Sequence, residues 1–112
     1  MAILQTPFQR AVPLAQRAAA FGAITSSYTL VGAVFTASPV FLYIMSTLDQ
    51  AVQISWDGVT DAIAVPVGST VPVYIPIDLK ANGIAMSGQF GVYVKEIGNP
   101  GAGSLYVGGF TV

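Results

Sequence analysis

Apolar side chains alternate with other residues along several segments of this 112-residue chain, most clearly after residue 24. The alternating sets are Val52, Ile54 and Trp56; Val71, Val73, Ile75 and Ile77; and Phe90, Val92 and Val94. Successive side chains of a β-strand point to opposite faces, so a period of two places each set on one face of a sheet. The sequence therefore predicts β-strands that each present one apolar face.

Residues that favour turns separate the predicted strands. These strands span 28–35, 40–47, 51–56, 62–65, 71–77, 89–97 and 104–111. Asp57 and Gly58 predict a tight hairpin turn between Trp56 and Val59. Short strands at intervals of roughly 8–12 residues are typical of a sandwich or a small barrel. We therefore predict an all-β fold, an antiparallel β-sandwich or jelly-roll-like small barrel, over residues 25–112.

Two prolines and two glycines mark special positions within these strands. Pro72 and Pro76 fall in the strand predicted over 71–77. Proline has no N–H to donate, which predicts that this strand lies at a sheet edge or at a bulge, where proline blocks the addition of another strand. Gly108 and Gly109, in the last predicted strand, indicate a bulge or a close backbone contact.

Residues 1–24 differ in composition from the rest and predict an N-terminal arm. The segment before Pro7 is predicted to be extended, and the alanine-rich stretch from Pro13 to Phe21 predicts a short helix that ends at Gly22. The arm is too apolar for a free tail, so it is predicted to dock on a neighbouring subunit, the alternative being a frayed terminus. The predicted interface residues are Phe8, Val12, Leu14 and Phe21. Removing residues 1–22 is expected to leave a folded β domain.

The supply of chemical groups argues against catalysis. The chain has no histidine and no cysteine, with four basic and five acidic residues. Most enzymes use a group that titrates near neutral pH, a thiolate or a metal cluster. We therefore predict no enzyme activity, no cofactor, no metal site and no small-molecule substrate. Asp57 and Asp61, the nearest acidic pair, are interpreted as turn residues rather than as an acid–base pair or a Ca²⁺ site.

The balance of apolar and charged residues predicts association. Hydrophobic residues make up 54% of the chain and charged residues 8%, against about 25% charged in an average protein. A lone monomer would expose apolar area that usually marks an interface, so we predict a homo-oligomer, for instance a trimer. The net charge of −1 and the scattered basic residues argue against nucleic acid as a partner.

An uncharged stretch over residues 18–48 raises the alternative of a membrane-spanning segment. Serine and threonine recur throughout this stretch, and its β-branched and aromatic content favours strands. Within it, residues 40–45 are apolar on both faces, which predicts a buried strand. We therefore predict no membrane association.

Trp56 ends an alternating strand and is interpreted as an aromatic anchor in the core or at an interface. The alternative is a carbohydrate-binding or adhesion module, in which Trp56 and nearby tyrosines would be exposed and stack on sugars.

Four segments carry a resemblance to a known class of protein: residues 54–61, 65–69, 92–95 and 103–107. With the strands around them, over residues 47–112, they resemble small β-sandwich virion proteins of tailed bacteriophages. The resemblance implies a structural virion protein of the head-decoration, cement or neck type, present in several copies. It implies self-association, contact with other virion proteins such as the major capsid protein, location in the virion and no catalysis.

Overall fold

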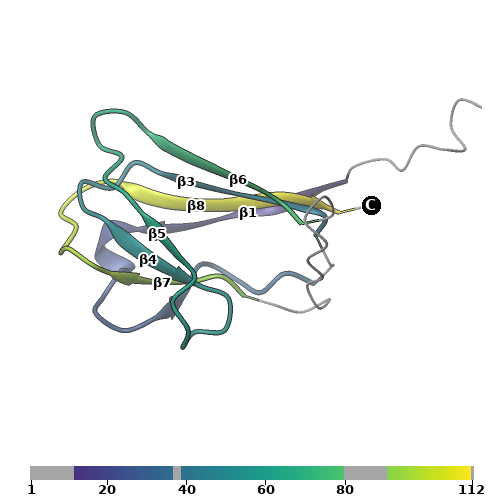
Figure 1. The fold of residues 1–112 in the computed structure, drawn as a ribbon, viewed down its shortest axis with the longest axis horizontal. Helices are drawn as coiled ribbons and strands as arrows, with labels where there is room; N and C mark the ends of the chain where they lie inside the picture. The colour runs from purple at the N-terminus through teal and green to yellow at the C-terminus, as the bar shows by residue number, and fades with distance from the viewer. Residues whose placement is uncertain (1–11, 37–38, 80–90, 112) are drawn as a thin grey trace, which may run out of the picture.

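Two antiparallel four-stranded sheets face each other in a computed structural model that describes residues 12–36, 39–79 and 91–111 (Figure 1). The first sheet has the order β1-β8-β3-β6, formed by Val12–Ala20, Ser104–Thr111, Phe41–Ser46 and Val73–Asp78. The second has the order β2-β7-β4-β5, formed by Thr29–Leu30, Tyr93–Glu96, Val52–Ser55 and Ile63–Val65. The predicted all-β sandwich is confirmed.

The strands pair as they would in one long hairpin wrapped around the core. β1 pairs with β8, β2 with β7, β3 with β6 and β4 with β5, each antiparallel. Only β4 and β5 follow one another within a sheet, and each other connection between consecutive described strands crosses from one sheet to the other. This order is that of an eight-stranded jelly roll, which matches the jelly-roll-like alternative in the prediction.

The core lies between the sheets. Its fully buried side chains include Leu42, Ile44, Val52, Ile54, Val94, Leu105 and Val107. Burying a side chain of this size stabilises a fold by about 1.5–3 kcal/mol. Burial alternates along β3, where Leu42, Ile44 and Ser46 are buried and the residues between them are partly exposed. The predicted period-two burial is confirmed for this strand.

The predicted helix from Pro13 to Phe21 is wrong. Residues 12–20 form β1, which pairs with β8 from Val12 opposite Thr111 to Ala20 opposite Ser104, and only Phe21–Ala23 form a single 3-10 turn. Alanine favours a helix, but a helix of two turns is marginal in water, whereas β1 gains the ladder hydrogen bonds of β8 and buries Ala19. Residues 12–20 of the predicted arm are thus an edge strand of the first sheet.

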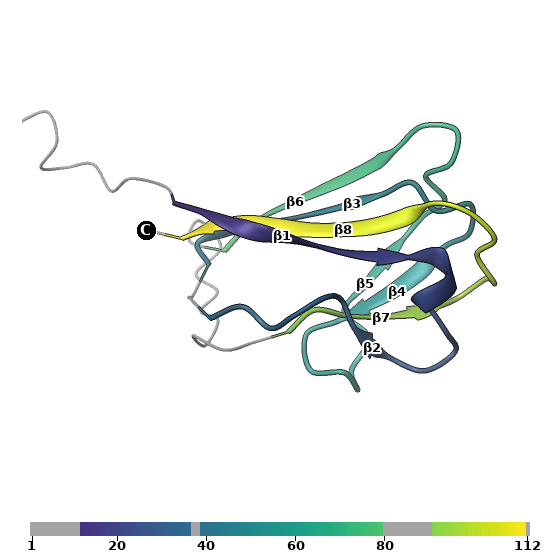
Figure 2. The same ribbon diagram turned by 180° about the vertical axis from the view of Figure 1, so that it is seen from behind.

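β1 and β6 lie at the two edges of the first sheet (Figure 2). The edge strand β6 contains Pro76, as the sequence predicted, whereas Pro72 precedes the strand. On β1 the register shifts between Leu14 and Arg17, so two residues oppose Gly108 alone. The extra residue of this bulge lies in β1, opposite Gly108, rather than in the last strand itself. The close backbone contact given as the alternative is present at Gly109, where a Cβ atom would lie 2.3 Å from the Phe41 carbonyl oxygen. In the described part of the chain, no helix is long and apolar enough to cross a bilayer.

Candidate interaction surface

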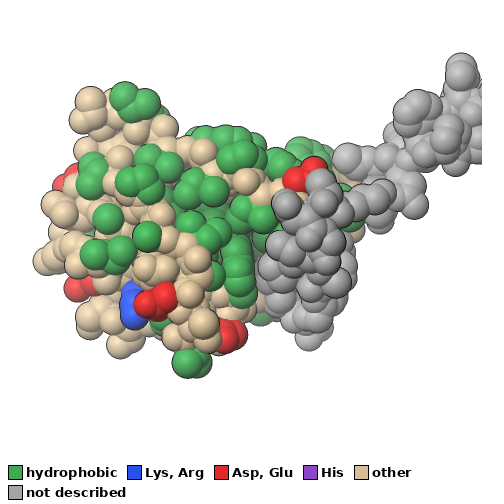
Figure 3. All heavy atoms as spheres, in the orientation of Figure 1, with side chains coloured by type: hydrophobic (Ala, Val, Ile, Leu, Met, Phe, Trp, Pro, Cys, Tyr) green, Lys and Arg blue, Asp and Glu red, His purple; other side chains and the backbone are tan. Residues whose placement is uncertain are grey.

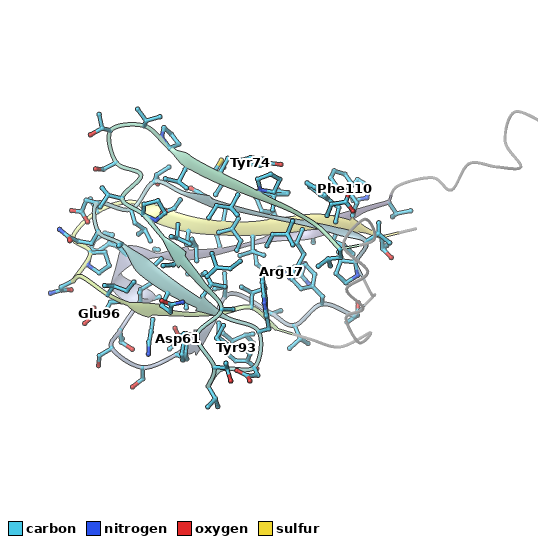
Figure 4. All side chains as sticks on the ribbon, in the orientation of Figure 1. Arg17, Asp61, Tyr74, Tyr93, Glu96 and Phe110 are labelled. Atoms are coloured by element: carbon cyan, nitrogen blue, oxygen red, sulfur yellow. The ribbon has the colours of Figure 1, made fainter. Side chains whose placement is uncertain are left out.

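The side chains of the first sheet that point away from the core form a surface that we call the outer face. Its described members include Pro13, Ala18, Ala20, Phe41, Tyr43, Met45, Tyr74, Pro76, Asp78, Ser104, Tyr106 and Phe110. Tyr74 and Phe110 lie on the side of the sheet away from the second sheet, whereas Arg17 points between the sheets (Figure 4). The outer face is thus aromatic and apolar across all four strands.

Strand register brings the aromatic side chains into cross-strand rows. Phe41 lies opposite Phe110, and their ring centroids are 6.1 Å apart with the planes tilted by 42°. Tyr43 stacks on Tyr74 with centroids 5.8 Å apart and planes 24° apart. Cross-strand aromatic pairs of this kind stabilise a sheet beyond simple burial. Met45 lies between Tyr106 and Tyr74 and completes the cluster.

Gly108 allows Tyr43 to lie against the backbone of β8. A Cβ atom at Gly108 would come within 2.3 Å of the Tyr43 hydroxyl oxygen and 2.4 Å of its Cζ. The tyrosine ring therefore covers the glycine, an arrangement in which an aromatic side chain packs where the glycine has none. The result is an aromatic cluster that continues from β6 across β3 to β8.

Charge is nearly absent from the outer face. Asp78, on the edge strand β6, is its one charged residue among those described. On the second sheet, by contrast, the outward residue Gln53 has Lys95 and Ala64 as its cross-strand neighbours. In Figure 3, hydrophobic side chains gather along the upper rim, over β6 and in the middle of the view below β6, and charged side chains lie toward the ends and the lower margin. The aromatic side chains of the outer face are half-buried against one another, and Tyr74 is 54% exposed. An apolar surface with so little charge is a candidate interaction site.

Arg17 closes the gap between the sheets beside β1. Its guanidinium carbon lies 4.1 Å from the centroid of the Phe35 ring, in a cation–π contact. Its Nε donates to the carbonyl of Ala33 at 3.1 Å and its Nη2 to the carbonyl of Val34 at 2.9 Å. Arg17 therefore ties the first sheet to the segment that follows β2, which is a structural role.

A cluster of Tyr28, Asp61 and Lys95 lies on the outside of the second sheet. The Tyr28 hydroxyl donates a hydrogen bond to Asp61, and Lys95 Nζ lies 3.4 Å from the same Asp61 oxygen and 4.7 Å from the centroid of the Tyr28 ring. Burial and the bond to Asp61 raise the pKa of Tyr28 to about 12. The hydrogen bond from Tyr28, followed by Lys95, lowers the pKa of Asp61. These contacts link the loop after β4 to β7 and to the residue before β2.

Asp57 organises the loop between β4 and β5. Its Oδ1 accepts hydrogen bonds from the backbone N–H groups of Thr60 at 2.7 Å and Val59 at 2.8 Å, and from Ser55 Oγ at 2.8 Å. These bonds, those from the Thr60 and Val59 backbones first, hold the pKa of Asp57 well below its usual range. Asp57 is therefore a residue of the loop between the two strands, and its side chain holds the backbone of that loop.

The prediction of a tight turn at Asp57 and Gly58 is wrong, although β4 and β5 do form the predicted hairpin. The Asp57 hydrogen bonds widen the loop, so that pairing resumes only where Ala62 N–H donates to the Ile54 carbonyl at 2.8 Å. Ser55 is fully buried by this loop and departs from the predicted alternation. Within the described ranges, no group of three or more His, Cys, Asp or Glu residues is placed to hold a metal ion.

The residues predicted for the interface do not come together. Val12 is 49% exposed at the start of β1, Phe21 is 42% exposed beyond its other end, and Leu14 packs against the core. Phe8 lies outside the described residues. Trp56 is half-buried and packs against the core, which agrees with an anchor rather than with an exposed platform.

The outer face was missed because β3 is apolar on both sides. The sequence predicted a fully buried strand over residues 40–45, but only its inner side is buried. The available signal was the pair of apolar sets in one strand, which becomes informative once the first sheet is known to have an open side. No family model, curated protein or solved structure matches the chain. The functional argument therefore rests on the geometry of the chain itself.

Proposed function

We propose that this chain is a structural protein that works without catalysis, as a repeated component of a larger assembly, and attaches through its outer face. The observation that carries the proposal is the outer side of the first sheet. This surface is aromatic and almost uncharged, and no described residues cover it. Covering such a surface stabilises an assembly by about 25 cal/mol per Å² of apolar area, less the cost of association.

We propose the virion of a tailed bacteriophage as that assembly, with the chain as a decoration, cement or neck component. The resemblance of residues 47–112 to small phage virion proteins supports this proposal. The architecture supports it by analogy, because jelly rolls occur in viral capsid domains. In this role the chain contacts other copies of itself and virion proteins such as the major capsid protein.

Purified virions test the proposal. Tailed particles released from cells that carry the genome encoding this chain are analysed by quantitative mass spectrometry and by immunogold electron microscopy. We expect many copies of the chain per particle, with label at the head or neck. Absence of the chain from particles, with free protein in the lysate, would contradict the virion role.

Variants show which surface attaches. Particles that lack the chain are mixed with purified protein and then sedimented. We expect Tyr74→Lys to lose binding to the particles and Val59→Lys to keep it, because Tyr74 belongs to the outer face and Val59 lies in the loop after β4. Equal binding by the two variants would exclude the outer face as the attachment surface.

A carbohydrate-binding module is the second candidate. The observation that favours it is Tyr74, which is 54% exposed and stacks on Tyr43, since jelly rolls also occur in lectins and exposed rings stack on sugars. The half-buried Trp56 gives it no support. Binding on a glycan array that Tyr74→Ala abolishes would favour this candidate over the structural role.

A further inference from the structure

We infer that, in the protein free of its assembly, the outer face binds a second copy of the same chain, outer face against outer face, in a two-fold symmetric dimer that opens when the chain attaches. This inference rests on the proposed function and names the partner of its surface. Three conditions must hold for such a dimer. The first sheet must associate through its face rather than through its edges, the face must suit an identical partner, and the area buried between the two copies must be large enough for a dimer to form.

Edge-to-edge association is hindered on both sides of the first sheet. Pro76 leaves β6 without one N–H group, and at the opposite edge β1 carries Pro13 and a register shift between Leu14 and Arg17. Prolines and bulges at edge strands prevent the addition of a further strand. The outer face is therefore the large surface through which this sheet can associate. Two sheet faces pack about 10 Å apart in β-sandwiches.

The charge distribution favours an identical partner. Asp78 lies in the edge strand, in the row that runs through Phe41 and Phe110 to Pro13, so it falls at the margin of a face-to-face contact in both copies. A strongly charged partner would bury its charges against aromatic rings without counter-charges. A second copy brings the same uncharged centre, and a net charge of −1 adds little repulsion.

The composition of the face is that of an interface centre. Tyr, Phe and Met are enriched in the buried centres of protein interfaces, and charged residues are depleted there. In a two-fold dimer both copies use the same patch, so each aromatic side chain of the patch is buried in the interface once from each copy. Tyr43, Tyr74 and Tyr106 also carry hydroxyl groups that can hydrogen-bond to the partner.

The available area indicates a weak dimer. Four strands of six to nine residues, at a spacing of about 4.8 Å, cover roughly 19 Å by 20–30 Å. This amounts to about 400–550 Å² per copy and about 800–1,100 Å² in the dimer, which is below the range of stable interfaces and within that of weak, transient ones. We therefore expect a dissociation constant in the micromolar range or weaker, so that attachment to the assembly can displace the second copy.

Sedimentation equilibrium of the full chain, from low micromolar to millimolar concentration, tests the inference. The wild-type protein is compared with Tyr74→Lys and Met45→Lys on the outer face, and with Val59→Lys and Ile97→Lys away from it. The four substitutions place the same charge at apolar sites, and Val59 and Ile97 are 80% and 57% exposed against 54% for Tyr74. Near-ultraviolet circular dichroism checks each fold, and Tyr74→Lys carries the test if Met45→Lys does not fold.

We expect a monomer–dimer equilibrium in the wild type, a dissociation constant at least about tenfold higher in the face variants, and an unchanged constant in the controls. A dimer that the face variants leave intact would overturn the inference. A monomer at millimolar concentration, combined with loss of particle binding by Tyr74→Lys, would overturn it and leave the proposed function standing. If the chain forms a dimer that depends on the outer face but is itself absent from virions, the proposed virion role alone would be overturned.

Discussion

Two side chains hold irregular backbone in place through several hydrogen bonds each. Asp57 accepts from the backbone of Thr60 and Val59, and Arg17 donates to the carbonyls of Ala33 and Val34. Backbone groups outside regular ladders must find partners in this way, because leaving them unpaired costs about 1–3 kcal/mol each when buried. Two of the described charged residues thus serve the fold rather than chemistry.

The lowered pKa of Asp57 predicts a specific dependence of stability on pH. Because its folded pKa lies below the unfolded value of about 3.9, the carboxylate stabilises the fold above that pH, and this contribution is lost as the pH falls through the folded pKa. We expect Asp57→Ala to have a lower Tm at neutral pH and a smaller further decrease in acid than the wild type. Thermal unfolding followed by circular dichroism between about pH 7 and pH 2 measures both.

Asp57→Asn is the matched variant for this experiment. The amide keeps an oxygen that can accept from Val59 and Thr60 but cannot ionise, so its Tm at neutral pH should fall between those of the wild type and Asp57→Ala. Parallel curves of Tm against pH for the wild type and Asp57→Ala would contradict a stabilising role of the ionised side chain.

At the scale of single elements, β1 decides how the N-terminal segment relates to the sandwich. It supplies nine residues to the edge of the first sheet and buries Ala19, while Leu14 packs against the core. Its pairing with β8 joins the two ends of the described chain, so the sheet closes only after the last strand is in place.

Removal of β1 is therefore expected to destabilise the domain, contrary to what the sequence suggested for residues 1–22. Chains that begin at residue 12 and at residue 23 differ by β1 and part of the 3-10 turn. We expect the shorter chain to have a free energy of unfolding lower by about 3 kcal/mol or more, from lost ladder hydrogen bonds and buried side chains. Urea unfolding measures the difference, and equal midpoints for the two chains would show that β1 is dispensable.

Local patterns predicted the elements whose signal is local. The strand over 104–111 was found at its actual bounds, and those over 40–47 and 51–56 were found to within a residue at each end, because alternation and turn residues lie within the segments themselves. β1 was missed because its alanine-rich sequence favours a helix, and only its pairing with β8, at the other end of the chain, makes it a strand. Local pattern does not encode such distant pairing.

At the scale of the whole molecule, the two outer surfaces of the sandwich differ in character. The second sheet presents Gln53 and Lys95 together with Leu30 and Tyr93, and the first presents the larger aromatic cluster of Phe41, Tyr43 and Tyr74. The contrast could not be predicted from the sequence, because Phe110 joins Phe41 only through the register of β8 against β3. The second sheet thus mixes polar and apolar side chains, whereas the first is almost uncharged, and an uncharged apolar surface is the one expected to meet a partner.

Self-association through the outer face is the central claim, and a dilution series of ¹H–¹⁵N correlation spectra of the full chain tests it most directly. With increasing protein concentration, we expect amide resonances to shift mainly in β3, β6 and β8, around Met45, Tyr74 and Tyr106, with little change in the second sheet. Shifts confined to the second sheet or to the loop that holds Val59, or spectra that do not depend on concentration, would contradict it.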